Sequence, residues 1–428
     1  MILFSHPTGN ANVRAALSGL LEAGLLKEFH TAVAAYLGNI WDRVSRLPGG
    51  REFRRRKFDA RLQPLTVQHP WRELGRMATN RLKLYQFTRH EAGIFCIDAV
   101  YRSLDKAVAR RIRKHPKNFT GVYAYEDGAL ATFTTARENN LQCFYDLPIA
   151  YWETAQKLLR EEAERLPAWE PTLGGTRDSA DKLARKTKEL ELANTVICPS
   201  RFVADSVPER ARREKRIVII PFGSPVTVPR EKQRSDASRK LRVLFAGSLT
   251  QRKGLGDLLD AMRLLNRNDV ELVILGSPQA PMEFYRQEWA DFIYESPRAH
   301  GEVLKLMRSC DVFCLPSIVE GRALVMQEAM SQGLPIIITA NTGGEDLIEE
   351  GSTGFLVPIR RPDKIAEKIV WFADNRALLP EMSRAAQCKA AQLTWEAYGR
   401  ELVEKIKSKN LKVEVGDQRS GFKLWNVR

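Results

Sequence analysis

The sequence predicts an α/β protein built from two doubly wound, parallel domains, and three observations lead to this prediction. The chain has 428 residues, which is long for a single domain and suggests two. Its hydrophobic fraction of 44% is large enough to form real cores. Short apolar runs alternate with helix-forming segments along most of the chain, which is typical of β–α–β units in a parallel sheet.

In the first half, the apolar runs are separated by helical patterns with recognisable ends. Asn12 and Ser200 are each placed to cap a helix. Pro116 ends a basic amphipathic helix, because proline cannot continue one. The strands are expected at 2–4, 29–37, 119–125, 141–145, 195–199 and 217–221, and the helices at 13–26, 99–114, 129–137, 152–166, 178–192 and 201–207. Residues 40–90 are rich in Arg, Pro and Gly, and no element is assigned to them.

The second half repeats the β–α–β pattern more regularly. Gly333 ends one helix and Pro362 begins another, at the positions these residue types prefer. The strands are expected at 242–246, 271–275, 311–316, 336–339 and 355–357, and the helices at 255–265, 302–308, 323–332, 362–373 and 395–407.

Residues 225–240 are polar and contain prolines, and they show almost no apolar periodicity. Such a segment is typical of a linker between domains. We therefore expect a first domain at 1–224 and a second at 241–392. A C-terminal helix at 393–408 would follow, and then a mobile or loosely docked tail at 409–428.

The stretch 310–354 predicts a strand, an acidic turn, a helix and a buried strand. Glu320 lies at the mouth of this helix and Glu328 lies inside it, about 12 Å apart along the axis at ~1.5 Å per residue. A helix N-terminus beside the end of a strand is a natural phosphate site. The pair therefore suits a nucleotide-diphospho-sugar, although the bare spacing also fits two solvated or capping glutamates.

A second polar turn, GSLTQRKG at 247–254, follows the first strand of the second half. Arg252 and Lys253 stand there at a helix start, where a bidentate fork and a point charge suit a pyrophosphate leaving group. The alternative is two solvated charges in a loop.

The pattern PSxxEGxxLVxxEAMxxGxPII at 316–337 resembles the C-terminal half of retaining GT-B glycosyltransferases of family 4. The resemblance covers 241–400 closely and the first half more loosely, through VICPS and IVIIPFG. It implies two Rossmann-like domains that face each other across a cleft. It also implies retaining, hexosyltransferase-type transfer from a nucleotide-diphospho-sugar donor to a hydroxyl acceptor, with no metal and no cofactor.

The resemblance also implies roles for individual residues on the donor side. Glu328 would bind the ribose hydroxyls, and Glu320 would hold the sugar hydroxyls near the reacting carbon. Arg252, Lys253 and the backbone N–H groups of Ala323–Leu324 would stabilise the departing diphosphate.

Glycines after strand ends let the backbone approach a substrate in this family, which implies such a role for Gly9, Gly247 and Gly276. Ser248 stands where the family usually has arginine, and we expect Arg252 to supply the missing cation. Arg322-Ala323 replaces the aromatic-glycine pair of many members, so residue 322 is a candidate for sugar contact and choice.

In α/β folds, polar residues just after strand ends line the ligand crevice. Tyr125, Glu126, Tyr145 and Asp146 are therefore the candidates of the first half. The family commonly has a histidine near Tyr145, and this chain does not. We choose Asp146 as the acceptor-hydroxyl binder or base, with the cap of the helix after Tyr151 as an equal alternative.

The formal net charge is +15, and the excess lies in the first half. Residues 1–240 contain 42 Lys and Arg against 27 Asp and Glu, whereas the rest contains 25 of each. The excess fits either ordinary solvated faces or contact with an anionic membrane surface, a lipid pyrophosphate or an acidic glycan. No motif supports nucleic-acid binding.

The six scattered cysteines are typical of reduced core residues, and no apolar run approaches the ~20 residues of a membrane span. We expect a cytoplasmic protein, with peripheral contact at the inner face of the plasma membrane as an open hypothesis. The expected function is cell-surface polysaccharide or glycolipid assembly on a glycan or lipid-linked acceptor. The alternative is a catalytically degenerate GT-B protein that binds sugar nucleotide or anionic glycan without turnover.

Overall fold

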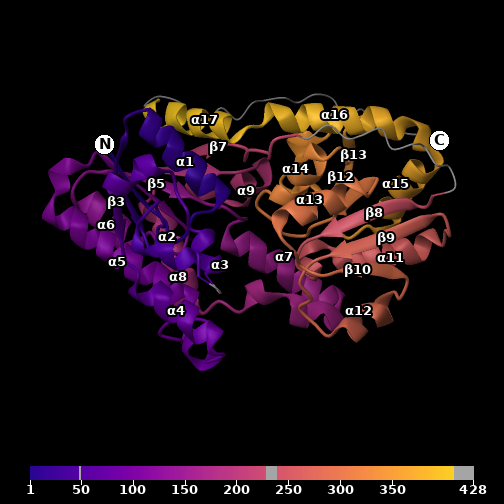
Figure 1. Cartoon of the computed structure of the whole chain (residues 1–428), viewed down its shortest axis with the longest axis horizontal. Coiled ribbons are helices and arrows are strands. Elements are labelled where there is room, and N and C mark those ends of the chain that lie inside the picture. Colours follow the sequence, from indigo (N-terminus) through magenta and orange to yellow (C-terminus); the bar gives the residue numbers. More distant parts are fainter. Residues whose placement is uncertain (48–49, 228–238, 409–428) are drawn as a thin grey trace.

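The computed structural model describes residues 1–47, 50–227 and 239–408, which form two parallel sheets placed side by side (Figure 1). The predicted α/β class with doubly wound parallel sheets is confirmed. Most of the linker predicted at 225–240, and the predicted tail at 409–428, lie outside the described residues.

The first sheet has seven strands in the order β3-β2-β1-β4-β5-β6-β7, and each neighbouring pair is parallel. Its strands are β1 (Ile2–Ser5), β2 (Leu26–Thr31), β3 (Thr66–Gln68), β4 (Gly121–Tyr125), β5 (Gln142–Asp146), β6 (Thr195–Cys198) and β7 (Arg216–Ile219). The helices of this half are α1 (Ala11–Glu22), α2 (Ile40–Ser45), α3 (Arg51–Arg54), α4 (Trp71–Arg81), α5 (Ile97–Lys114), α6 (Leu130–Glu138), α7 (Trp152–Arg165), α8 (Ala180–Leu192), α9 (Arg201–Ser206) and α10 (Glu209–Glu214).

The second sheet has six strands in the order β10-β9-β8-β11-β12-β13, again all parallel. Its strands are β8 (Leu241–Ala246), β9 (Val270–Leu275), β10 (Phe292–Glu295), β11 (Val312–Leu315), β12 (Ile336–Ile338) and β13 (Gly354–Leu356). The helices of this half are α11 (Leu255–Leu265), α12 (Met282–Glu288), α13 (His300–Arg308), α14 (Leu324–Ser331), α15 (Pro362–Asp374), α16 (Leu379–Gln392) and α17 (Trp395–Lys407).

The central strands were predictable because they are buried on both faces. Every residue of β4 and β11 is buried, so these strands appear in the sequence as continuous apolar runs. The elements without a prediction are short or polar, such as β3 at one edge of the first sheet and α2, α3 and α4 within 40–90. β10, the corresponding edge strand of the second sheet, also had no prediction, nor did α12 and α16.

The last two helices run across both halves of the molecule, along the top of Figure 1. α16 packs against α14 of the second half, and α17 packs against α1 of the first. Two glycines permit the second contact: a Cβ added to Gly19 would lie 2.5 Å from the Gly399 carbonyl oxygen. None of the helices in the described ranges is both long and apolar enough to cross a membrane.

We predict that Gly19→Ala lowers the melting temperature although alanine is the better helix former. The new methyl group would force α1 and α17 apart, and such overpacking costs about 1–3 kcal/mol. Gly301→Ala is the matched control, because Gly301 also lies in a helix and has open space around it. There the intrinsic preference of about 1 kcal/mol should stabilise the protein or leave it unchanged. Equal effects of the two substitutions would contradict the close packing of α17 on α1.

Candidate active site

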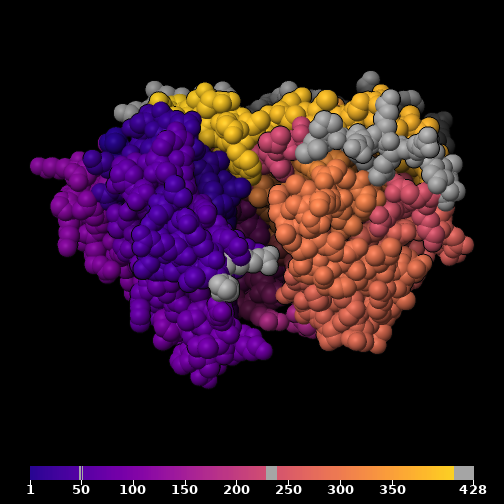
Figure 2. Space-filling model, in the orientation of Figure 1, coloured from indigo at the N-terminus to yellow at the C-terminus, as the bar shows by residue number. Residues whose placement is uncertain are grey.

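A cleft of about 870 Å³ lies between the two halves, and Figure 2 shows the hollow between the indigo-purple lobe and the orange lobe. The first half lines it with His6, Asn10, Ala11, Asn12, Ile97, Tyr101, Tyr125, Glu126, Asp127, Pro148 and Phe222. The second half lines it with Ala246, Gly247, Ser248, Lys253, Leu275, Gly276, Ser277, Pro297, Arg298, Val303, Glu320, Arg322, Ala323, Leu324 and Val325. The cleft therefore opens at the carboxyl ends of both sheets, where ligands of doubly wound folds bind.

The wall formed by the second half begins at two glycines that follow β8 and β9. Gly276 has φ +156°, and a Cβ on it would lie 1.6 Å from the Gly247 carbonyl oxygen. No other residue fits there, so the wall presents bare backbone and the small side chains of Ser248 and Ser277. Gly247, Ser248 and Gly276 thus lie where the sequence analysis expects them, at the edge of the cleft.

Glu320 and two cations form the charged centre of this wall. The Lys253 Nζ and the Arg252 Nη1 contact the same carboxylate oxygen, Oε1, at 2.5 and 2.8 Å. Burial alone would raise the pKa of Glu320, but the neighbouring Lys253 and Arg252 outweigh it and lower the pKa. Glu320 is therefore an ionised carboxylate that is already hydrogen-bonded to cations.

The two cations differ in position. Lys253 lines the cleft, whereas Arg252 does not, and its guanidinium also donates to the Val319 carbonyl at 3.0 Å. The Arg252 carbonyl in turn accepts from the Ile318 N–H at 2.9 Å. Arg252 thus holds the acidic turn in place, while Lys253 faces the ligand space.

The N-terminus of α14 offers backbone donors beside Lys253. The Ala323 N–H, which the sequence analysis expects to be available for a diphosphate, already donates to the Thr342 carbonyl at 3.2 Å. The N–H groups of Leu324 and Val325 have no acceptor within the described residues. Among the described residues, the N–H groups without an acceptor at this helix N-terminus therefore begin at Leu324, one residue later than the sequence suggested.

Arg322 lines the cleft, and most of its guanidinium N–H groups are engaged by the protein. It donates to Asp346 Oδ1 at 2.6 Å, to the Gly343 carbonyl at 2.9 Å and to Gln327 Oε1 at 2.9 Å. This side chain clamps the turn before α14 onto the loop after β12. Four of its five N–H groups are thus used within the protein, and one on Nη2 has no acceptor among the described residues.

Glu328 lies on α14, outside the set of residues that line the cleft. Its Oε1 is 3.0 Å from Nε2 of His300, the first residue of α13, and its side chain is 22% exposed. Its proposed role toward a ribose stays a prediction.

Asp146 and Gly9 do not line the cleft. Asp146 is the last residue of β5 and is buried, and it accepts a hydrogen bond of 2.5 Å from the Tyr123 hydroxyl. Burial raises its pKa to about 7, against the opposing effect of its bonds to Tyr123 and Tyr125. Asp146 therefore supports the cleft residue Tyr125 from behind. Gly9 packs under Phe58, whose Cζ would lie 2.4 Å from an added Cβ.

Several cleft residues escaped the sequence analysis. Asn10 and Asn12 stand at the start of α1, and Tyr101 lies on α5. Arg298 lies in the loop before α13, where no motif marked it. Only the placement of Asn10 after the first strand carried a recognisable signal, because polar residues after strand ends line such clefts.

The two halves are joined by a buried polar network behind the cleft. Glu162 of α7 is fully buried and bonds to Arg165 at 2.7 Å and to Gln251 at 2.8 Å. Arg165 also pairs with Asp257 of α11, and Arg360 pairs with Glu162. The network therefore connects α7 of the first half to the turn that carries Lys253.

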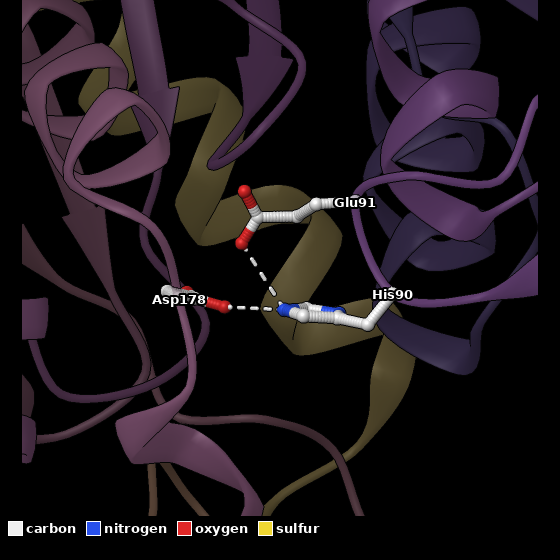
Figure 3. A group of neighbouring side chains, drawn as sticks. All are labelled: His90, Glu91 and Asp178. Carbon is white, nitrogen blue, oxygen red and sulfur yellow. Dashed lines mark hydrogen bonds and ion pairs between the residues drawn. The ribbon is translucent and has the colours of Figure 1, made fainter.

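One further group of side chains has the chemistry of a cation site. His90 Nε2 lies 3.1 Å from both Glu91 Oε1 and Asp178 Oδ1 (Figure 3). Asp178 also pairs with Lys182 at 2.9 Å, and Glu91 accepts from the Ser179 N–H at 3.0 Å. These bonds satisfy the carboxylates and attach the loop before α5 to the start of α8.

Residues 228–392 match the family model described as glycosyl transferases group 1. The D-inositol 3-phosphate glycosyltransferase of Paenarthrobacter aurescens is 29% identical over 199 residues, which are 42% of this chain and 49% of that protein. The putative colanic acid biosynthesis glycosyltransferase WcaL of Salmonella typhimurium is 29% identical over 185 residues, 39% of this chain and 45% of that protein. These matches thus span about half the length of the curated relatives or less.

The solved structures with a similar fold match nearly the whole chain. Sucrose-phosphate synthase from Thermosynechococcus elongatus superposes with a TM-score of 0.64 and 16% identity, covering 95% of this chain and 98% of that one. Anabaena Alr3699/HepE in complex with UDP superposes with a TM-score of 0.61 and 16% identity, covering 95% and 99%. The chain therefore has the GT-B fold, and residues 228–392 in its second half match the glycosyl transferases group 1 model.

Proposed function

We propose that this protein transfers a sugar from a nucleotide-diphospho-sugar to a hydroxyl acceptor. The observation that carries the proposal is a combination on one wall of the cleft: Lys253 lies beside the N–H groups of Leu324 and Val325, which have no acceptor among the described residues. A cation beside a helix N-terminus stabilises the negative charge that develops on a leaving diphosphate. The bare backbone at Gly247 and Gly276 leaves room for that group.

The comparisons support a nucleotide-sugar donor. Among the similar structures, HepE has been solved in complex with UDP-glucose, at a TM-score of 0.57 and 15% identity. The similar curated proteins are named as glycosyltransferases, including one of colanic acid biosynthesis. We propose a hexose as the transferred sugar, and a glycan or lipid-linked acceptor in cell-surface polysaccharide or glycolipid assembly.

In this proposal Lys253 contacts the diphosphate, and the carboxylate of Glu320 contacts the sugar hydroxyls. Arg252 keeps Glu320 in place. Removing one preorganised contact of this kind typically slows catalysis by about 10²–10³. Glu328 would bind the ribose by moving its carboxylate away from His300. No cofactor enters this chemistry, and Lys253 with the helix N-terminus would take the part of a metal ion.

We further propose retention at the anomeric carbon by attack from the front face. Glu320 is paired with two cations, which makes its carboxylate a weak nucleophile. The leaving phosphate would accept the proton of the attacking hydroxyl instead. A product whose anomeric proton shows inversion in NMR would contradict this part of the proposal.

The donor site is tested by thermal stabilisation with a panel of nucleoside diphosphates and nucleotide-sugars. A ligand that binds only the folded state raises the melting temperature. We expect one nucleotide to do so selectively. Lys253→Met should weaken its binding about 10- to 100-fold, since a hydrogen bond to a charged group is lost. Glu328→Gln should weaken the binding of nucleotides, which contain a ribose, but leave the binding of pyrophosphate unchanged.

Lys305→Met is the matched control, because Lys305 is an exposed lysine of α13 that pairs, among the described residues, with its helix neighbour Glu302. No stabilisation by any nucleotide would contradict the donor site. Selective stabilisation without turnover on any acceptor would support the second candidate, a degenerate GT-B protein that only binds. The absence of the family's arginine at Ser248 is the observation that favours this alternative.

We also propose that the first half contacts an anionic membrane through α4 and the loop that follows. Residues 81–87 are all exposed, and this run combines Arg81 and Lys83 with Leu82 and Tyr85. The first residue of α4, Trp71, is also exposed. Aromatic, aliphatic and basic side chains together are typical of helices that lie at a lipid surface.

The charge of this segment also suits an anionic lipid. Within residues 71–97 the carboxylates are Glu73 and Glu91. Glu73 is buried and its charge is balanced by Arg56 and Arg76, whereas Glu91 is hydrogen-bonded to the neutral Ser179. The exposed basic side chains therefore face solvent with little opposing charge.

We predict that the protein floats with phosphatidylglycerol-containing vesicles and not with pure phosphatidylcholine vesicles, and that salt weakens the binding. Lys83→Gln should weaken it about fivefold, at about 1 kcal/mol per basic residue near the surface. Leu82→Ser should weaken it as well. Leu264→Ser is the control, because Leu264 is 61% exposed on the other half of the molecule while Leu82 is 67% exposed. Equal flotation of all variants would contradict this contact surface.

A further inference from the structure

The two walls of the cleft differ in charge. Its cationic residues, Lys253, Arg298 and Arg322, all come from the second half. No Lys or Arg from the described part of the first half lines the cleft. The large positive excess of residues 1–240 is therefore directed elsewhere, and the wall opposite the donor is neutral or acidic.

Glu126 is the most unusual residue of that wall. It follows β4 directly, and its N–H donates to the Asp146 carbonyl at 3.1 Å, which anchors it to β5. Its side chain lines the cleft and the residue is only 8% exposed. One carboxylate oxygen, Oε2, faces Lys186 Nζ at 3.6 Å. The other, Oε1, has no hydrogen-bond partner within the described residues.

An unpartnered buried acceptor is costly, by about 1–3 kcal/mol. Such groups are rare in folded proteins, and one at the wall of a ligand cleft is explained when a ligand supplies the missing donor. The neighbouring cations do not supply it: Lys186 approaches Oε2 and is shared with Asp127 and Asp178 at 3.8 and 3.4 Å.

We propose that Glu126 holds the acceptor by accepting a hydrogen bond from one of its hydroxyl groups, and that the part of the acceptor inside the cleft is an uncharged polyol. This inference rests on the proposed glycosyl transfer and names the acceptor class of the same site. A phosphate or carboxylate group placed here would face Glu126 and Asp127, and the cations beside them, Lys182, Arg185 and Lys186, already pair with carboxylates of the protein. A sugar hydroxyl meets no such repulsion.

The rest of this wall suits a sugar ring. Tyr101 and Tyr125 contribute aromatic surface on either side of the His6 ring, whose centroid lies 6.0 and 4.6 Å from theirs. Burial lowers the pKa of His6 to about 4, so this ring is uncharged at neutral pH. Asn12 adds an amide that can donate and accept. Apolar faces with a few polar groups are the usual composition of small-molecule sites.

The ionisation of Glu126 should appear in acceptor binding. Burial raises the pKa of Glu126 to about 7, although Lys186 acts in the opposite direction. The ionisable groups that surround it are Asp127, Lys182, Lys186, Glu189, Tyr101, Tyr145 and Tyr151. Because an ionised carboxylate is the stronger acceptor, sugar affinity should rise as the pH passes through 7.

The test is saturation-transfer NMR with glucose, maltose, glucose 6-phosphate and glucuronate. The protein is first loaded with the nucleoside diphosphate that stabilises it most. We expect the wild type to bind the neutral sugars more tightly than the anionic ones, and with an affinity that rises from pH 6 to pH 8. Glu126→Gln should weaken the binding of the neutral sugars about tenfold. It should also abolish the pH dependence of that binding. The difference in affinity between neutral and anionic sugars should become smaller or change sign.

Two controls distinguish failure of this inference from failure of the proposed function. Glu138→Gln replaces an exposed glutamate at the end of α6 and should behave as the wild type. The melting-temperature rise with nucleotide should be equal in all variants, which shows that each folds and keeps its donor site. If nucleotide binds but the anionic sugars bind better than glucose, or if Glu126→Gln leaves the preference unchanged, the inference is overturned. Absence of any neutral-sugar signal overturns it as well. Loss of nucleotide binding in the wild type would instead refute the proposed function.

Discussion

The buried carboxylate of Glu162 is the group on which the arrangement of the two halves depends. It is fully buried where α7 meets the second half, and Arg165, Gln251 and Arg360 each bond to it. A buried charge is tolerable only when it is paired and hydrogen-bonded in this way. Because these partners come from both halves, the two sheets cannot rotate apart without exposing an unpaired charge. The same contacts therefore join the two halves that form the walls of the cleft.

The same network positions the donor wall. Gln251 bonds to Glu162 and stands immediately before Arg252 and Lys253. Arg252 then ties its turn to Glu320, which leaves Lys253 facing the cleft. A chain of buried polar contacts thus leads from the interface to the one lysine that we assign to the diphosphate. Such preorganisation favours electrostatic stabilisation, since no group has to reorient as charge develops.

The two walls of the cleft differ in charge. Lys253, Arg298 and Arg322 line it from the second half, whereas the described part of the first half contributes Glu126, Asp127 and uncharged groups that include aromatic and amide side chains. The basic residues of the first half lie on outer surfaces such as α4 and its following loop. A neutral sugar inside the cleft and a lipid anchor outside it would satisfy both features at once. In that arrangement the positive charges of the first half would bind the anionic lipid surface and would not contact the reacting groups.

The sequence by itself determined the fold class and the main β–α–β units, and it predicted that Glu320 and Lys253 belong to one site. The strands of these units are buried on both faces and so form continuous apolar runs. The two candidates occupy one local unit around Glu320 and one turn around Lys253, and the structure brings both to one wall of the cleft. The edge strands β3 and β10 are only three and four residues long, and neither was predicted. The acceptor wall was decided only by tertiary structure. Asp146 and Glu126 both follow a strand pattern in the sequence, but the pleat of the sheet buries the first behind Tyr125 and leaves the second at the cleft. Which of two such carboxylates lies at the cleft depends on packing between segments that are distant in the sequence. The local sequence around each carboxylate therefore cannot predict it.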